Sequence, residues 1–198
     1  VDGGKMSKSL GNTYTISQLQ EKGILPLSFK MFCYTANYRT KLNFTFEGAF
    51  AAQKALERLY DSYLKNLNGS DEITEEEIER YKEKFLNNIN DDMNMPAAMG
   101  VVWEAARNQR KSPKLAELLL KFDEVLGLDI KNANKYLQEL KDMQNNIEIP
   151  EEVKKLVEER KTARQEKDWE KSDTIRNKIE NLGYSIKDTK DGIIVEKL

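Results

Sequence analysis

Histidine is absent from the sequence, and cysteine occurs only once, at Cys33. Without imidazole, the chain lacks the side chain that most often shuttles protons near neutral pH and most often binds metals. A single cysteine excludes an internal disulfide and any zinc site built from several cysteines. We therefore expect no metal site in this chain and no catalysis that depends on histidine.

Long apolar runs are also missing. No segment approaches the roughly 18 apolar residues of a membrane helix, mean hydropathy is −0.72, and no signal-peptide pattern is visible. Hydrophobic residues make up 39% of the 198 residues, which is enough for a packed core. We expect a folded, monomeric cytoplasmic protein with no membrane span.

The chain has little net charge, −2, but its charges are unevenly placed. Residues 71–92 carry nine acidic and three basic side chains, whereas residues 160–178 carry seven basic and four acidic ones. Because nucleic acids are polyanions, the first stretch repels them and the second tolerates them. Any nucleic-acid contact is therefore expected to come from local patches and not from a global positive field.

Helical patterns dominate the first 145 residues. Thr15 with Gln18, and Thr74 with Glu77, have the spacing of capping boxes, so helices are expected to begin at both places. Between residues 46 and 67, apolar side chains recur every three or four residues, as in a helix with one buried face. Similar patterns follow, and together they predict an antiparallel helical bundle. The residues of the 46–67 pattern are Ala49, Ala52, Leu56, Leu59, Tyr63 and Leu67.

The polar segment MQNNIEIP, residues 143–150, interrupts the helical pattern and ends in proline. Two further helices are expected over 151–165 and 169–182. Alternating Tyr184 and Ile186, followed by a turn at Asp191-Gly192, then predict a β-hairpin. The fold class is thus mainly α: an antiparallel helical bundle followed by a small α/β unit with a C-terminal hairpin.

These patterns divide the chain into three expected parts. Residues 1–45 form an opening loop and a connecting segment, and residues 46–145 form the helical bundle. Residues 146–198 form the small α/β unit, which begins after the helical pattern is interrupted.

The opening segment, VDGGKMSKSLGN, places Lys5 and Lys8 three residues apart between glycines. Lysine carries a compact charge on a flexible stem, which suits an anionic group that must be gripped. A basic, solvated loop is the ordinary explanation for a lysine pair. The fixed string KMSKS is much more specific than a lysine pair, and it indicates a loop that handles phosphates.

KMSKS matches the second signature of class I aminoacyl-tRNA synthetases, with the flanks GKMSKSLGN. Downstream, YRTKLNFT, DDMNMP and ARQEKDWEKSDTIRNKIENLGYSIKDTKDG make the whole chain resemble the cysteinyl-tRNA synthetases. The resemblance implies the C-terminal portion of a ligase that activates cysteine with ATP and Mg²⁺ and transfers it to tRNA(Cys). In that family a nucleotide-binding fold and a zinc site precede the signature loop, so we expect a fragment that is inactive alone.

The resemblance also implies roles for residues of the opening loop. Lys5 and Lys8 are expected to act on the ATP phosphates during activation, and Lys8 is the more direct contact. Ser7 and Ser9 are expected to assist in binding ATP or to shape the loop. Tyr38 and Arg39 also fit the family pattern, and we expect a contact between this segment and the acceptor stem of tRNA.

In the tail, the family's anticodon-reading positions fall on Arg164, Asp173 and Asp188, with Trp169 beside them. The assignment makes chemical sense, because arginine pairs with a guanine edge and carboxylates accept from amino groups of cytosine and adenine. Without the resemblance, the three charged residues would be ordinary exposed charges. For Trp169, packing in the core and stacking on a base both stay open.

Two functions from other classes stay open beside the ligase. One is a non-catalytic tRNA-binding module that keeps the bundle and the tail but does not use the loop. The other is a plain helical interaction domain. The sequence encoded upstream of Val1 would separate the ligase from the non-catalytic module.

Overall fold

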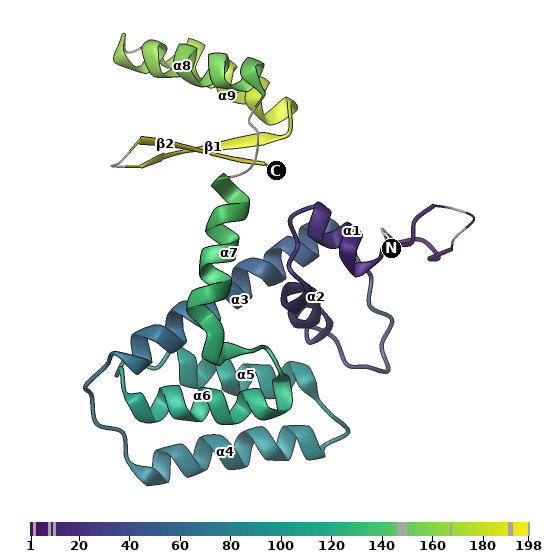
Figure 1. The fold of residues 1–198 in the computed structure, drawn as a ribbon, viewed down its shortest axis with the longest axis vertical. Helices are drawn as coiled ribbons and strands as arrows, with labels where there is room; N and C mark the ends of the chain where they lie inside the picture. The colour runs from purple at the N-terminus through teal and green to yellow at the C-terminus, as the bar shows by residue number, and fades with distance from the viewer. Residues whose placement is uncertain are drawn as a thin grey trace. The chain divides into compact units, whose positions relative to one another are not determined.

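The computed structural model describes residues 1, 3–7, 9, 11–145, 150–166, 168–189 and 192–197. The chain divides into two compact units, Val1–Gln138 and Glu139–Leu198, and each has its own apolar core. Figure 1 shows that the chain is mainly helical and carries one β-hairpin, as the sequence predicts. No helix within the described ranges is both long and apolar enough to span a bilayer.

Helices begin in the first unit where the sequence carries capping signals. At Thr15 and Thr74 the side chain accepts from the backbone three residues on, and both predicted capping boxes are confirmed. The elements are α1 (Ile16–Glu21), α2 (Pro26–Cys33), α3 (Phe46–Leu67), α4 (Glu75–Asn90), α5 (Met95–Ala106), α6 (Pro113–Leu126), the 3₁₀ turn η2 (Ile130–Asn132) and α7 (Ala133–Asn145), which continues into the second unit.

The core of the first unit lies between α3, α4, α5 and α6. Short connections join α4 to α5 and α5 to α6, so consecutive helices run antiparallel and lie side by side (Figure 1). Phe85 of α4 stacks on Phe122 of α6, with ring centroids 4.3 Å apart. The buried cluster extends without a break from Leu19 to Ala133, so α1 and α2 share the core of the bundle.

Helix α3 corrects one part of the predicted apolar face. Leu67, expected on that face, is 47% exposed, whereas its neighbour Asn66 is fully buried. The reason is local: the Asn66 amide donates to Ser62 O at 2.9 Å and accepts from Ser112 N at 3.4 Å. These bonds allow a polar side chain to occupy the core position, and Leu67 is turned outward at the last residue of the helix.

The second unit contains α8 (Glu151–Gln165), α9 (Trp169–Asn181) and an antiparallel hairpin of β1 (Tyr184–Thr189) and β2 (Gly192–Lys197). The two predicted helices and the predicted hairpin are therefore confirmed. Of the predicted turn at Asp191-Gly192, Asp191 lies outside the described residues. The unit's small core consists of Val153, Ile175, Ile179, Tyr184 and Ile186.

Candidate functional site

The opening loop is held by the side chain of Asn12. Its Oδ1 accepts from Ser7 N at 2.8 Å, and its Nδ2 donates to Lys5 O at 2.9 Å. Gly3 N donates to Asn43 Oδ1 at 2.8 Å and ties the start of the loop to the segment before α3. The side-chain amide of Asn12 thus bridges two backbone groups of the loop. The sequence reasoning assigned no role to Asn12, and its place in the GKMSKSLGN string was the only signal.

The predicted phosphate-binding residues lie on this closed loop. Lys5 and Ser9 are exposed and Ser7 is half-buried, and the two serine hydroxyls lie 2.7 Å apart. In the described part of the chain, Lys5 makes no ion pair, so its ammonium is available to an anion. Lys8 lies outside the described residues.

In the second unit, the structure brings two of the predicted residues together. Arg164 lies in the last turn of α8, and Trp169 is the first residue of α9. The Arg164 guanidinium lies 6.0 Å from the centre of the Trp169 ring. Trp169 is 59% exposed and is therefore not a core residue. A large exposed aromatic ring beside a cation is suited to stacking on a nucleobase.

The other two predicted residues follow along the chain. Asp173 is exposed on α9 and lies one helical turn after Trp169, so the two side chains share a face. The backbone of Asp188 pairs with Ile193 in the hairpin, but the Asp188 side chain lies outside the described part. The structure thus places three of the four side chains at one end of the α8–α9 hairpin.

A buried arginine next to this group was missed by the sequence reasoning. Arg160 lies one helical turn before Arg164 and is only 4% exposed. Arginine is rarely so buried, and its burial in so small a unit is unusual. Helical spacing from Val153 and Val157 places it on the apolar face, but composition alone reads it as a surface charge.

Tyr38 and Arg39 meet the turn between α4 and α5. The Tyr38 hydroxyl donates to Asp92 Oδ1 at 2.8 Å, and Arg39 Nη2 donates to the same oxygen at 2.9 Å. Asp92 and Met93 both have left-handed backbone, with φ of 53° and 52°, which is uncommon for non-glycine residues. Two of the sequence strings that carry the family resemblance, YRTKLNFT and DDMNMP, therefore contact each other in space.

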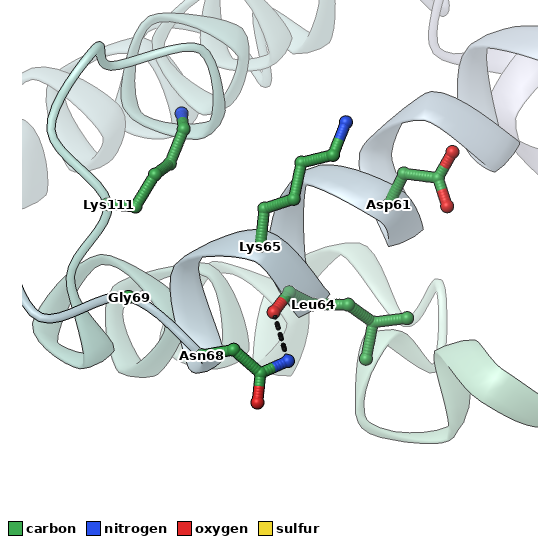
Figure 2. A pocket seen from close by; sticks show the side chains of 6 residues that line it. All are labelled: Asp61, Leu64, Lys65, Asn68, Gly69 and Lys111. Carbon is green, nitrogen blue, oxygen red and sulfur yellow. Dashed lines mark hydrogen bonds between the residues drawn. The ribbon is translucent and has the colours of Figure 1, made fainter.

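A shallow hollow of about 520 Å³ lies at the C-terminal end of α3. Figure 2 shows its lining, in which the Asn68 amide donates to Leu64 O at 2.9 Å. Gly69 is needed here, because a Cβ would lie 2.1 Å from Lys111 O. None of the predicted site residues lines the hollow, which lies where the α3–α4 connection meets the α5–α6 connection. The lining residues are Asp61, Leu64, Lys65, Asn68, Gly69 and Lys111.

The pKa shifts in the first unit come from burial, neighbouring charges and hydrogen bonds. Burial raises the pKa of the Cys33 thiol, which favours its protonated form. Burial, together with the Asp123 charge, also raises the pKa of Tyr34. The Arg110 hydrogen bond lowers the pKa of Glu77. No group of three acidic, cysteine or histidine side chains within the described ranges is arranged to hold a metal ion.

Comparison with known proteins finds relatives over nearly the whole chain. A sequence model of the cysteinyl-tRNA ligase anticodon-binding domain matches residues 147–195. Cysteine–tRNA ligase 1 of Burkholderia lata is 36% identical over 188 residues, which cover 95% of this chain and 37% of that protein. The cysteine–tRNA ligase of Chlamydia caviae is 34% identical over 204 residues, covering 100% and 43% respectively. The chain therefore spans about two fifths of the length of the curated relatives that it matches.

Proposed function

We propose that this chain, which belongs to the cysteinyl-tRNA synthetase family and matches the C-terminal portion of its members, supplies the signature loop and the anticodon-binding unit of a cysteine–tRNA ligase. The whole enzyme would activate cysteine with ATP and transfer it to tRNA(Cys). Because positioning of both substrates requires the rest of the enzyme, this chain is inactive alone. The observation that carries the proposal is the match of residues 147–195 to an anticodon-binding domain.

The opening loop would act on ATP. The exposed Lys5 ammonium and the paired hydroxyls of Ser7 and Ser9 suit an anionic polyphosphate, and Lys8 would contact the phosphates most directly. Mg²⁺ would arrive with the nucleotide and neutralise phosphate charge, held mainly by the phosphates themselves. The lysines would stabilise the charge that develops on the phosphates as cysteine is activated.

The tail would read the anticodon of tRNA(Cys). Arg164 would pair with a guanine edge, and Asp173 and Asp188 would accept from the amino groups of the other two bases. The exposed ring of Trp169 supports stacking on one of these bases. In this proposal the loop that opens residues 1–45 serves activation and the segment with Tyr38 and Arg39 contacts the acceptor stem. Residues 46–145 support these parts, and residues 146–198 recognise the anticodon.

The remaining parts of the proposal concern partners and location. Tyr38 and Arg39 would contact the acceptor stem, although Asp92 already engages both side chains and would have to give up those bonds. We further propose that the ligase works as a monomer in the cytoplasm, with no metal held by this chain. Zinc, where the family uses it, would be bound by the part that precedes the loop.

Binding to short RNAs tests the proposal. The chain should prefer an anticodon stem-loop with the GCA anticodon over stem-loops with other anticodons. Because one contact to a base edge is typically worth about 1 to 3 kcal/mol, Arg164→Ala and Asp173→Ala should each reduce that preference by roughly ten- to a hundredfold. Binding should be measured by fluorescence anisotropy at low salt, because screening weakens phosphate contacts.

The first unit provides a matched control for this experiment. Arg107 lies over the ring of Trp103, 4.7 Å from its centre, and so repeats the Arg164–Trp169 pair away from the tail. Arg107→Ala should leave the anticodon preference unchanged. Equal affinity of the unaltered chain for cognate and swapped stem-loops would overturn the proposal.

A further inference from the structure

The chain turns sharply after α6, and side chains from distant helices bind the backbone of that turn. Three consecutive carbonyls accept hydrogen bonds from α2, its C-terminal cap and α3. We call residues 126–130 the α6–η2 turn. The donor and acceptor pairs are Tyr34 Oη to Leu126 O at 2.6 Å, Lys30 Nζ to Gly127 O at 2.8 Å, and Tyr60 Oη to Leu128 O at 2.7 Å.

Asp123 fixes the same turn from the α6 side. Its Oδ1 accepts from Leu128 N at 2.6 Å, and its Oδ2 accepts from Ile130 N at 2.8 Å. Both Leu128 and Ile130 are fully buried, so these backbone groups are shielded from water. The α6–η2 turn is therefore held by carboxylate acceptors on one side and by three donors on the other.

The donors connect the turn to the segment that follows the signature loop. Lys30 and Tyr34 are one helical turn apart and share a face at the end of α2. Gly127 is left-handed, with φ of 56°, and a Cβ there would lie 2.5 Å from Lys30 Nζ. Glycine thus allows both the turn and the close approach of the ammonium.

One residue of the α6–η2 turn and one residue of α3 also contact the first turn of α7. Asp129 accepts from Asn132 Nδ2 at 2.9 Å and from the Tyr136 hydroxyl at 3.2 Å. The Tyr136 ring stacks on Tyr60, with centroids 5.8 Å apart. Tyr60 therefore contacts both the α6–η2 turn and the start of α7, through which the chain continues to the anticodon-binding unit.

We propose that Lys30, Tyr34 and Tyr60 are positioning residues for the ligase reaction, an inference that rests on the proposed function. Buried leucines would hold the turn in the core without them, but apolar contacts do not fix direction. Three directed bonds hold the α6–η2 turn, which leads into α7, against α2 and α3. Because α2 follows the signature loop and α7 leads to the anticodon-binding unit, these bonds link recognition of the anticodon to transfer of cysteine.

The test uses the ligase that contains this chain, with Tyr34→Phe, Lys30→Met and the double variant. Cysteine-dependent ATP–pyrophosphate exchange should stay at the unaltered level, because activation needs no tRNA. Aminoacylation kcat should fall about ten- to a hundredfold, as small misplacements of bound substrates do. The ratio of aminoacylation kcat between cognate tRNA and tRNA with a substituted anticodon should become smaller. In the variants, recognition of the anticodon is no longer linked to the transfer step.

Tyr63→Phe is the matched control, since Tyr63 is a buried tyrosine on α3 and, within the described residues, has no hydrogen bond to the turn. If exchange and aminoacylation fall together, or if the control behaves like the variants, the bonds only support the fold and the inference is wrong. An active enzyme whose variants keep full kcat and full anticodon dependence also overturns the inference. An unaltered ligase that cannot charge tRNA(Cys) would refute the proposed function, and this inference with it.

Discussion

Single residues of the opening loop have separable tasks. Asn12 closes the backbone by bonds to Ser7 N and Lys5 O, and it leaves the Lys5 ammonium exposed. The loop backbone is therefore held in place, while the Lys5 ammonium stays exposed. Such a charge is useful when it meets its target late, because an interaction made only in the transition state raises the rate without tightening substrate binding.

If the proposed function is right, Lys5→Ala and Lys8→Ala in the ligase that contains this chain should lower the rate of cysteine activation far more than they weaken ATP binding. Removal of one donor aimed at developing charge commonly costs about a hundred- to a thousandfold in rate. Single-turnover kinetics and equilibrium ATP binding measure the two effects separately. Lys41→Ala, an exposed lysine beyond the loop, is the control. Unchanged activation in both loop variants would show that the lysines are solvated bystanders.

For single residues, the sequence indicates which ones are functional candidates better than it predicts their burial and their contacts. The lysine pair was recognisable because a short string carries it, whereas the closing role of Asn12 depends on the loop being folded. Whether Trp169 packs or stacks could not be decided, because exposure is set by tertiary neighbours. Asn66 took a core position from Leu67 for the same reason: its bonding partner Ser112 lies 46 residues away in the sequence.

Helix starts could be predicted from sequence because capping is local. Thr74 and Glu77 lie three residues apart, and α4 begins there as expected. The ion pairs that join α4 to α6, and to the segment before α6, were not predictable from the sequence. Glu77 pairs with Arg110 and Glu75 with Lys114, at 2.5 Å in the second case, and nothing in their spacing indicates a partner more than thirty residues away.

The Glu77–Arg110 pair predicts a pH dependence for the first unit. The hydrogen bond from Arg110 lowers the pKa of Glu77 in the folded protein. Its stabilisation is therefore complete above the ordinary glutamate pKa of about 4.3 and is lost as pH falls through the lowered native value. In thermal scans followed by circular dichroism, the Tm of Glu77→Gln should fall less between about pH 5 and pH 3 than the Tm of the unaltered chain. This pH range brackets the ordinary glutamate pKa.

Glu76 is the matched control for this prediction. It is exposed on the same turn of α4, and the described residues offer it no ion pair. Glu76→Gln should leave the acid slope of Tm as it is in the unaltered chain. An identical slope for Glu77→Gln would show that the pair with Arg110 contributes nothing to acid stability.

The whole molecule is divided into units of unequal core size. The first unit buries a cluster that includes residues from α1 through α7, whereas the second is held by a few apolar side chains on α8, α9 and β1. Small cores leave little surplus over the entropy of ordering the chain. The second unit should therefore be the first to unfold, and a bound RNA should stabilise it selectively.

Heating the chain should produce two transitions. The two tryptophans report on different units, Trp103 on the first and Trp169 on the second. With Trp103→Phe, fluorescence should follow the lower transition; with Trp169→Phe, it should follow the upper one. A GCA stem-loop at about a hundred times its Kd should stabilise only the unit that unfolds first, by about 2.7 kcal/mol. A single coincident transition in both variants would contradict independent units.

The α6–η2 turn has a consequence for how such a protein changes over evolutionary time. Its donors bind main-chain carbonyls, which every amino acid carries. Exchange of one apolar side chain for another within the turn therefore leaves the bonds intact, whereas one inserted or deleted residue would move all three carbonyls at once. At the apolar positions of this segment, drift is thus constrained in length far more than in identity. Relatives should vary by substitution at Leu126, Leu128 and Ile130 while they keep the spacing from Asp123 to Ile130 constant.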